Sequence, residues 1–416
     1  MTDKAKRYLL PLILIVSLFF LWGAANNLND VLMKHFKKAF ILDDFQTGLI
    51  QSAFYFGYFC FAIPAALFMK RFGYKAAVVL GLALFGAGAL LFLPAADSRS
   101  YAFFLLALYV LASGLAFLET SANPLVTVLG DPSGAEQRLN FAQSFNPLGS
   151  ITGVLIGSNF ILSGVEYTPE QTAAMSDSAL QAYYAAETAA VKGPYLVIGL
   201  FVLVWAALVA FVKFPPAAAK VEDEVASKGD YGALFGKPLF LLGVVAQFFY
   251  VGAQVGVWSF LIRYTQAELP GTGEKWAAQA ITISLVLLFV GRFLGAAAMS
   301  RIAPAKLLAG FAAINVLLCI VGALVGGSTG LAALIATSLF MSIMFPTIFA
   351  LSLRGLGPLT KAGSSLLVMS IIGGAVLTAV MGYISDKSSI ALAMLVPALA
   401  FVAVFAFARS AGKAAA

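Results

Sequence analysis

The chain has 416 residues, of which 61% are hydrophobic and only 11% are charged, and its formal net charge is +7. Soluble domains carry about 25% charged residues, so this composition excludes a water-soluble globular protein. No basic stretch is long enough, or interleaved with aromatic residues in the right way, to form a nucleic-acid groove. The positive charge therefore does not indicate a nucleic-acid-binding protein.

Apolar runs recur along the whole chain, and each is about as long as the ~20 residues that cross a bilayer as a helix. They show no period-two alternation, and in lipid only helices and closed barrels satisfy every backbone polar group. The runs predict an all-α membrane protein with twelve transmembrane helices. The expected spans are 8–36, 45–70, 76–95, 101–128, 138–163, 193–214, 237–267, 276–299, 305–325, 330–353, 362–384 and 388–409.

The longest charged linker divides these spans into two sets of six, and it contains Pro215 and Pro216. We therefore expect an N-terminal six-helix lobe over 1–214, a cytoplasmic linker over 215–236 and a C-terminal six-helix lobe over 237–416. Two pseudo-symmetric six-helix bundles are the arrangement that this division predicts.

The two halves also resemble each other at corresponding places. The segment 64–75 joins the second span to the third, as 295–306 joins the eighth to the ninth, and both contain a proline and basic residues. Asn123-Pro124 in span four corresponds in position to Phe345-Pro346 in span ten. Paired halves of this kind are typical of alternating-access transporters, which bind substrate near the midplane between the repeats.

Lysine and arginine predict the orientation, because they gather at alternate gaps between spans. With the N-terminus inside, most of them fall in the inner gaps, whereas the outer gap from Glu166 to Lys192 is mostly acidic. The positive-inside rule then places both termini in the cytoplasm. The first apolar run continues too long and lacks a small-residue cleavage site, so we interpret it as a first span rather than a signal peptide.

Two of the nineteen acidic residues, Asp30 and Glu119, lie inside long apolar stretches. A carboxylate at the bilayer centre costs about 3 kcal/mol on insertion scales, and more if it stays charged and unpartnered. Two such residues in one half of the chain indicate a proton or ion relay. A structural acid that is paired with a buried donor is the alternative.

Several motifs carry a family resemblance. They are 19–30 (FFLWGAANNLND), 45–58 (FQTGLIQSAFYFGY), 118–124 (LETSANP), 247–254 (QFFYVGAQ), 258–264 (WSFLIRY) and 346–349 (PTIF). Through them the chain resembles the major facilitator superfamily and, within it, the branch of the fucose permeases, which are L-fucose:proton symporters. The glucose/galactose transporters share the two most specific motifs, those of spans one and four, so the sugar stays open.

The resemblance runs through all twelve spans and implies a secondary active, proton-coupled monosaccharide importer that works by alternating access. It further implies a monomer in a bacterial inner membrane, with no cofactor and no metal. The sequence departs from the pattern of the resembled family at two places. The segment 69–73 (MKRFG) lacks the acid that precedes the arginine in the superfamily's loop signature, and Phe345 stands where the fucose permease has a tyrosine.

The first lobe is expected to hold the coupling residues and part of the sugar site. Asn27 shares a helix face with Asp30, and amide and carboxylate groups suit sugar hydroxyls, which both donate and accept. We expect Asp30 to link proton and sugar, and Glu119 to carry the proton, because burial disfavours the charged form of a carboxyl. The resemblance places Gln143 and Asn146 in the sugar cavity. Interhelical polar packing is the alternative for these amides.

The second lobe is expected to complete the sugar site through one helical stripe. Gln247, Gln254 and Trp258 recur at spacings of seven and four, and Tyr250 lies on the same face. An aromatic ring beside amides can stack on the apolar face of a sugar, and Trp22 could supply a second aromatic surface from the first lobe. Packing between helices is the alternative interpretation of the stripe.

The remaining residues with reactive or charged side chains give little indication of a chemical function. For Arg292, the one cation that we expect to be buried, we expect snorkelling or a salt bridge at a gate, with a role in coupling as the alternative. His35, the only histidine, lies near the outer end of span one and is expected at the interface. Cys60 and Cys319 fall in apolar segments of opposite halves and imply no disulfide framework. No metal-ligand set, nucleophile–base set or phosphate loop is present in the sequence, so we expect no enzyme.

Three further classes of function compete with the proton-coupled importer. A sodium-coupled sugar symporter is the nearest, because carboxylate and amide oxygens also ligate sodium. A drug/proton antiporter would have a mainly apolar and aromatic cavity, whereas this sequence offers several amides. The two-lobed repeat argues against a channel. The lack of a nucleophile–base set argues against an intramembrane enzyme.

Overall fold

The computed structural model describes residues 13–25, 40, 44–128, 132–156, 160–161, 171, 174–212, 231–272 and 274–414. These residues are almost entirely helical, and no strand occurs among them. The residues Asn27, Asp30 and His35, to which the sequence assigns roles, lie outside the described part.

The helices of the first half follow the predicted spans, except for α7 (Asp177–Ala189). They are Ile13–Ala25, α2 (Asp44–Ser98), α3 (Tyr101–Val128), α4 (Ala135–Gln143), α5 (Phe145–Ile156), α7 (Asp177–Ala189) and α8 (Lys192–Phe211). Helix α2 contains the second and third spans, and it breaks at Gly73, whose φ of 85° and ψ of 171° are not helical. A glycine suits this break because a positive φ is strained for other residues. The predicted gap between these spans is confirmed.

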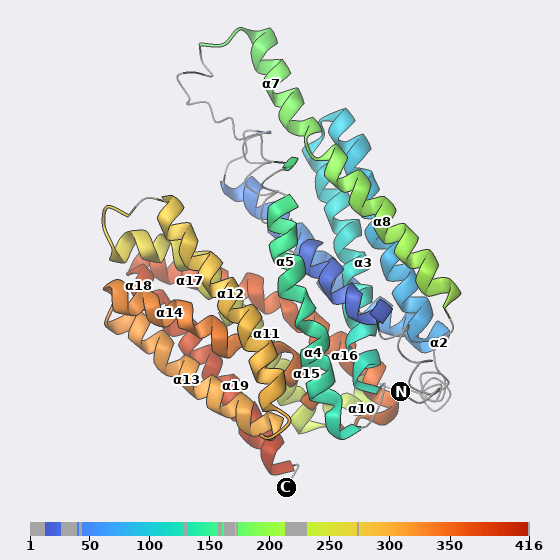
Figure 1. Ribbon diagram of the computed structural model, residues 1–416, viewed down its shortest axis with the longest axis vertical. Helices are drawn as coiled ribbons and strands as arrows, with labels where there is room; N and C mark the ends of the chain where they lie inside the picture. Colours follow the sequence, from blue (N-terminus) through green and yellow to red (C-terminus); the bar gives the residue numbers. More distant parts are fainter. Residues whose placement is uncertain are drawn as a thin grey trace. The chain divides into compact units, whose positions relative to one another are not determined.

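The second half begins with α10 (Tyr231–Phe235), and its spans are contiguous helices or pairs of shorter ones. They are α11 (Pro238–Glu268), α12 (Glu274–Ala298), α13 (Pro304–Leu324), α14 (Gly327–Met341), α15 (Met344–Leu353), α16 (Thr360–Met369), α17 (Gly373–Lys387), α18 (Ile390–Ala393) and α19 (Leu395–Ala414). Short 3₁₀ turns lie at Gly357–Leu359 and at Ser370–Ile372, on either side of α16. Helix α13 packs against both α14 and α19, and Figure 1 shows the three side by side.

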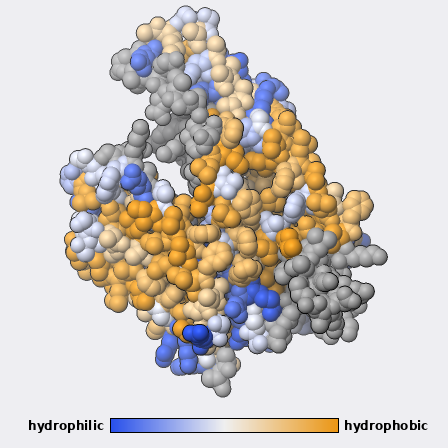
Figure 2. Space-filling model, in the orientation of Figure 1, coloured by the Kyte–Doolittle hydropathy of each residue, from blue (hydrophilic) through white to orange (hydrophobic). Residues whose placement is uncertain are grey.

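The described part contains nine helical segments long and apolar enough to cross a membrane, besides the shorter apolar helix Ile13–Ala25. Their outer surfaces are apolar. On α8, Val197, Phe201 and Val204 recur at helical spacing and are exposed by 67%, 49% and 59%. Figure 2 shows hydrophobic side chains over much of the visible face. Such exposure would be costly in water and is what contact with lipid tails requires.

The chain packs into two compact units. One consists of Met1–Phe61, Lys75–Glu119 and Leu148–Pro215, and the other of Ala62–Tyr74, Thr120–Pro147 and Pro216–Ala416. The segment Thr120–Pro147 therefore belongs to the unit that the second half of the chain forms. The lobes predicted over 1–214 and 237–416 were defined from the repeat in the sequence. That division of the chain stays a prediction.

One predicted gap has more structure than the sequence indicated. Between Glu166 and Lys192 we expected only an outer loop, whereas residues Asp177–Ala189 form α7. The Ser176 hydroxyl accepts a hydrogen bond from the Ala179 N–H at 3.3 Å and so caps the first turn. An alanine-rich helix with a polar surface lacks the apolar periodicity on which the prediction depended.

Glycines allow two helices of the first unit to touch backbone to backbone. A Cβ at Gly149 would meet the Phe20 carbonyl oxygen, and one at Gly153 would meet the Ala24 carbonyl oxygen. The second unit repeats the device between α17 and α11, where a Cβ at Gly373 would meet the Phe248 carbonyl oxygen. Small residues at such crossings are the usual means of helix association in lipid.

We expect Gly149→Leu to destabilise the protein by about 3 kcal/mol, the upper end of overpacking costs, because a backbone carbonyl cannot rotate away. The midpoint of thermal unfolding of the purified protein in detergent measures this effect. Gly310→Leu is the matched control, since nothing lies within 4 Å of a Cβ at Gly310. Equal midpoints for the two variants would show that the crossing is not tight.

Candidate functional site

Glu119 lies in the middle of α3 and is only 8% exposed, as its place in an apolar stretch predicts. Tyr58 of α2 is 2% exposed, and its side chain is hydrogen-bonded to Glu119. Among the described residues no lysine or arginine forms an ion pair with this carboxyl group. A carboxyl group that faces a hydroxyl rather than a cation in an apolar surrounding is suited to exchange a proton, since its neutral form is favoured there.

Trp22 and Asn146 differ in their accessibility. Trp22, in the helix Ile13–Ala25, is 3% exposed, and its ring centroid lies 4.3 Å from that of Phe19. In this conformation Trp22 therefore packs within its own unit. Asn146 of α5 is half-buried. The sugar-binding roles of both residues stay predictions.

Two prolines leave backbone carbonyls open for contacts with the second half of the chain. Pro124 in α3 has no N–H to bond the Thr120 carbonyl four residues before it, and this oxygen accepts from the Ser364 hydroxyl of α16 at 3.0 Å. Pro147 in α5 likewise leaves the Gln143 carbonyl open, and Arg292 Nη1 of α12 donates to it at 2.6 Å. Each Asn-Pro pair thus provides an acceptor for a side chain far along the sequence.

A chain of three buried polar side chains begins at Arg292. Its Nη1 also donates to Gln143 Oε1 at 3.1 Å, and Gln143 Nε2 donates to Asn123 Oδ1 at 2.9 Å. Arg292, Gln143 and Asn123 are exposed by 4%, 4% and 0%. The gate salt bridge that we considered for Arg292 is not formed with any described carboxylate. Arg292 instead donates to the Gln143 carbonyl, which Pro147 leaves open.

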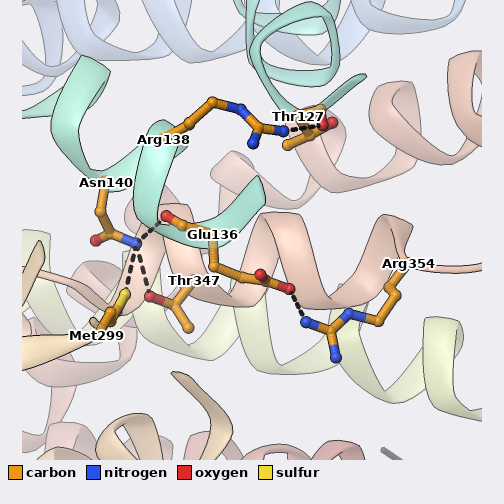
Figure 3. A network of polar contacts seen from close by, with 7 residues as sticks. All are labelled: Thr127, Glu136, Arg138, Asn140, Met299, Thr347 and Arg354. Atoms are coloured by element: carbon orange, nitrogen blue, oxygen red, sulfur yellow. Dashed lines mark hydrogen bonds and ion pairs between the residues drawn. The ribbon is translucent and has the colours of Figure 1, made fainter. Parts of the chain in front are cut away.

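A second group of contacts joins α4 to α12 and α15 (Figure 3). Glu136, which is 1% exposed, forms an ion pair with Arg354 at 2.5 Å. Asn140 Nδ2 donates to the Thr347 hydroxyl at 3.0 Å and lies 3.6 Å from Met299 Sδ. These contacts tie the segment Thr120–Pro147 to helices of the second half.

Arg138 has a local role in the same region. Its Nη2 donates to the Thr127 carbonyl at 2.9 Å, at the end of α3, so it holds α4 against the helix before it (Figure 3). The Glu136–Arg354 pair was missed, because charges at span ends look alike in a sequence whether they are paired or solvated.

The predicted stripe on α11 divides into bonded and unbonded members. The Tyr250 hydroxyl donates to the Met341 carbonyl at 3.1 Å, and Trp258 Nε1 donates to the Ser338 hydroxyl at 3.0 Å, so both polar groups contact α14. Gln247 is fully buried, and neither atom of its amide has a hydrogen-bond partner among the residues that the structure describes. Gln254 is half-buried. The two aromatic contacts favour packing in this conformation, whereas Gln247 retains its full bonding capacity.

Phe345, which replaces a tyrosine of the resembled branch, lies beside this stripe. Its ring centroid is 6.4 Å from that of Tyr250 and 6.2 Å from that of Phe349. The position is therefore filled by aromatic packing. Among the described residues no group of three His, Cys, Asp or Glu side chains could hold a metal ion.

The repeated apolar spans, the buried carboxyl group and the buried amides define an integral membrane transporter. The chain belongs to the Major Facilitator Superfamily, whose family model matches residues 12–360. It has the twelve-helix fold of that family.

Curated relatives match nearly the whole chain. The L-fucose-proton symporter of Escherichia coli (strain K12) is 46% identical over 412 residues, which cover 98% of this chain and 94% of the relative. The glucose/galactose transporter of Brucella abortus biovar 1 (strain 9-941) is 38% identical over 401 residues, covering 96% and 93%. Among solved structures, FucP in the outward conformation matches with a TM-score of 0.89 and 46% identity, covering 97% of this chain and 99% of FucP.

Proposed function

We propose that the protein is a proton-coupled importer of L-fucose or a closely related monosaccharide, and that it works by alternating access in a bacterial inner membrane. The observation that carries the proposal is Glu119, a carboxyl group that is buried inside a membrane helix and bonded to a tyrosine side chain, with no lysine or arginine of the described residues in an ion pair with it. The near-complete match to L-fucose-proton symporters supports the choice of sugar and of coupling ion.

The proposed cycle uses the change in charge at Glu119. Protonation removes a buried negative charge, which lowers the cost of passing through the occluded state. Release of the proton on the other side restores the charge and the preference for an open pathway. In this proposal Asp30 links the step to the sugar, because its spacing from Asn27 in the sequence predicts a shared helix face. The Asn27 amide can bond a sugar hydroxyl.

The contacts of α4 would close the pathway at one end of the molecule. The distribution of Lys and Arg assigns the ends of spans four, five and ten near Arg354 to the cytoplasm. We infer that the Glu136–Arg354 pair and the Asn140–Thr347 hydrogen bond hold the cytoplasmic end shut, and that sugar release requires both to break. A monomer contains every residue that this scheme uses.

Uptake by proteoliposomes tests the proposal. Labelled L-fucose should accumulate under an inward pH gradient and not under an inward sodium gradient at constant pH. Unlabelled L-fucose, galactose, glucose and arabinose should compete in proportion to their affinity. Accumulation that follows sodium alone would overturn proton coupling, and stronger competition by galactose and glucose than by L-fucose would favour the transport named for the Brucella relatives.

Asp30→Ala should abolish both L-fucose binding and driven uptake, because it removes a group that serves the sugar and the proton together. Equilibrium binding of labelled L-fucose to the purified variant measures the first effect, and proteoliposome uptake measures the second. Binding at the wild-type level would contradict the placement of Asp30 near the sugar.

A further inference from the structure

The chain of hydrogen bonds from Arg292 has a fixed direction. A guanidinium group has five donors and no acceptor, so the Gln143 atom that faces Arg292 must be the amide oxygen. The Gln143 amide nitrogen then points to Asn123, which can meet it only with its own oxygen. Arg292 thereby sets the orientation of two amides that could otherwise turn either way.

Because the hydrogen bonds run in this direction, the series that starts at Arg292 ends in a donor, the Asn123 amide nitrogen. Asn123 Nδ2 is buried and has no hydrogen-bond partner in the described part of the protein, and neither has Arg292 Nε. A buried donor without an acceptor costs free energy, because the polar group has lost its water and gained nothing. The cluster thus contains more donors than acceptors, and a ligand rich in oxygen acceptors would complete it.

The place of Asn123 in α3 supports a position of its side chain near the transported molecule. Asn123 follows Glu119 by four residues, so the two lie on the same face of the helix, one turn apart. Gln143, the partner of Asn123, is one of the residues that the family resemblance assigns to the sugar cavity.

We propose that the Asn123 amide N–H group binds an oxygen of the transported monosaccharide, and that Arg292 is a positioning residue that turns this donor toward the sugar through Gln143. The proposal rests on the proposed function. In the conformation described, the donor is enclosed, so it meets its acceptor at another step of the transport cycle.

The test compares L-fucose with its singly deoxygenated derivatives by equilibrium binding to the purified full-length protein. Wild type should bind one derivative, that lacking the acceptor oxygen, about fivefold more weakly than L-fucose, as expected for one neutral hydrogen bond. Asn123→Ala should bind L-fucose and this derivative equally. Asn123→Leu, which fills the space of the amide without a donor, serves the same purpose if the alanine variant does not fold.

Three further variants separate positioning from stability. In Arg292→Met the Gln143 amide is free to turn, so discrimination against the derivative should shrink toward unity, whereas Arg292→Lys retains a donor and should restore part of it. Asn315→Ala is the matched control, because Asn315 of α13 is also a fully buried amide that has no hydrogen-bond partner within the described part of the chain. It should discriminate as wild type does.

Unchanged discrimination in the Asn123 variants would overturn the proposal. So would a shift in the pH dependence of uptake with discrimination intact, since the donor would then serve a carboxylate rather than the sugar. If wild type bound neither L-fucose nor D-galactose, the proposed function itself would fail. If wild-type uptake is normal and only the predicted loss of discrimination is missing, the proposed function stands without this inference.

Discussion

Glu119→Gln should abolish the uphill accumulation of L-fucose while it leaves sugar exchange intact. Glutamine has nearly the size and the hydrogen-bonding capacity of protonated glutamic acid, so the variant resembles the loaded state permanently. It can therefore pass through the occluded state with sugar bound, but it has no proton to release. Proteoliposomes measure both processes, through uptake under a pH gradient and through counterflow of labelled sugar without one.

Glu268→Gln provides the control for the chemical change. Glu268 accepts a hydrogen bond from the Gly327 N–H at 2.9 Å, where it caps α14, and a glutamine oxygen can do the same. Accumulation should therefore be normal in this variant. If gradient-driven uptake survived at full level in Glu119→Gln, another group would carry the proton, and Asp30 would be the first candidate.

The fold class was predictable because burial in lipid demands apolar runs of a definite length. The predicted span 101–128 agrees with α3, and the gap after residue 70 agrees with the break at Gly73. Glu119 was identifiable for the same physical reason, since a carboxylate is costly inside an apolar helix and is therefore rare there. Helix α7 was missed because its polar surface gives no apolar pattern.

Partners of the polar residues were not predictable from the sequence. Arg292 bonds to Gln143 across 149 positions, and Arg354 pairs with Glu136 across 218. Helical spacing relates residues three or four apart, so it carries no information on such pairs. The Asn-Pro pairs gave a partial signal, because a proline always leaves a carbonyl open, but only the fold shows which side chain bonds to it.

The Glu136–Arg354 pair should respond unequally to the loss of each partner. The Glu136 side chain is 1% exposed, whereas that of Arg354 is 46% exposed. Arg354→Gln leaves a buried carboxylate without a cation, a change that typically costs about 3–5 kcal/mol. Glu136→Gln leaves an arginine that can reach water, so it should cost about 1 kcal/mol, the worth of a hydrogen bond.

Thermal unfolding of the purified variants measures this asymmetry. The double variant Glu136→Gln/Arg354→Gln should be more stable than Arg354→Gln alone, because no charge then stays buried, and the double-mutant cycle isolates the pair. Asp97→Asn is the control, since the Asp97–Lys192 pair is 67% and 37% exposed and should contribute at most about 1 kcal/mol.

The same variants test whether the pair closes the cytoplasmic end. Under the proposed scheme the pair holds the cytoplasmic end shut, so loss of either partner should shift the population toward cytoplasmic opening, and Arg354→Gln should shift it further. Accessibility of a cysteine placed at Thr347, in a background lacking Cys60 and Cys319, reports that opening. Equal accessibility in wild type and both variants, with unequal stability, would make the pair a structural contact that the transport cycle never breaks.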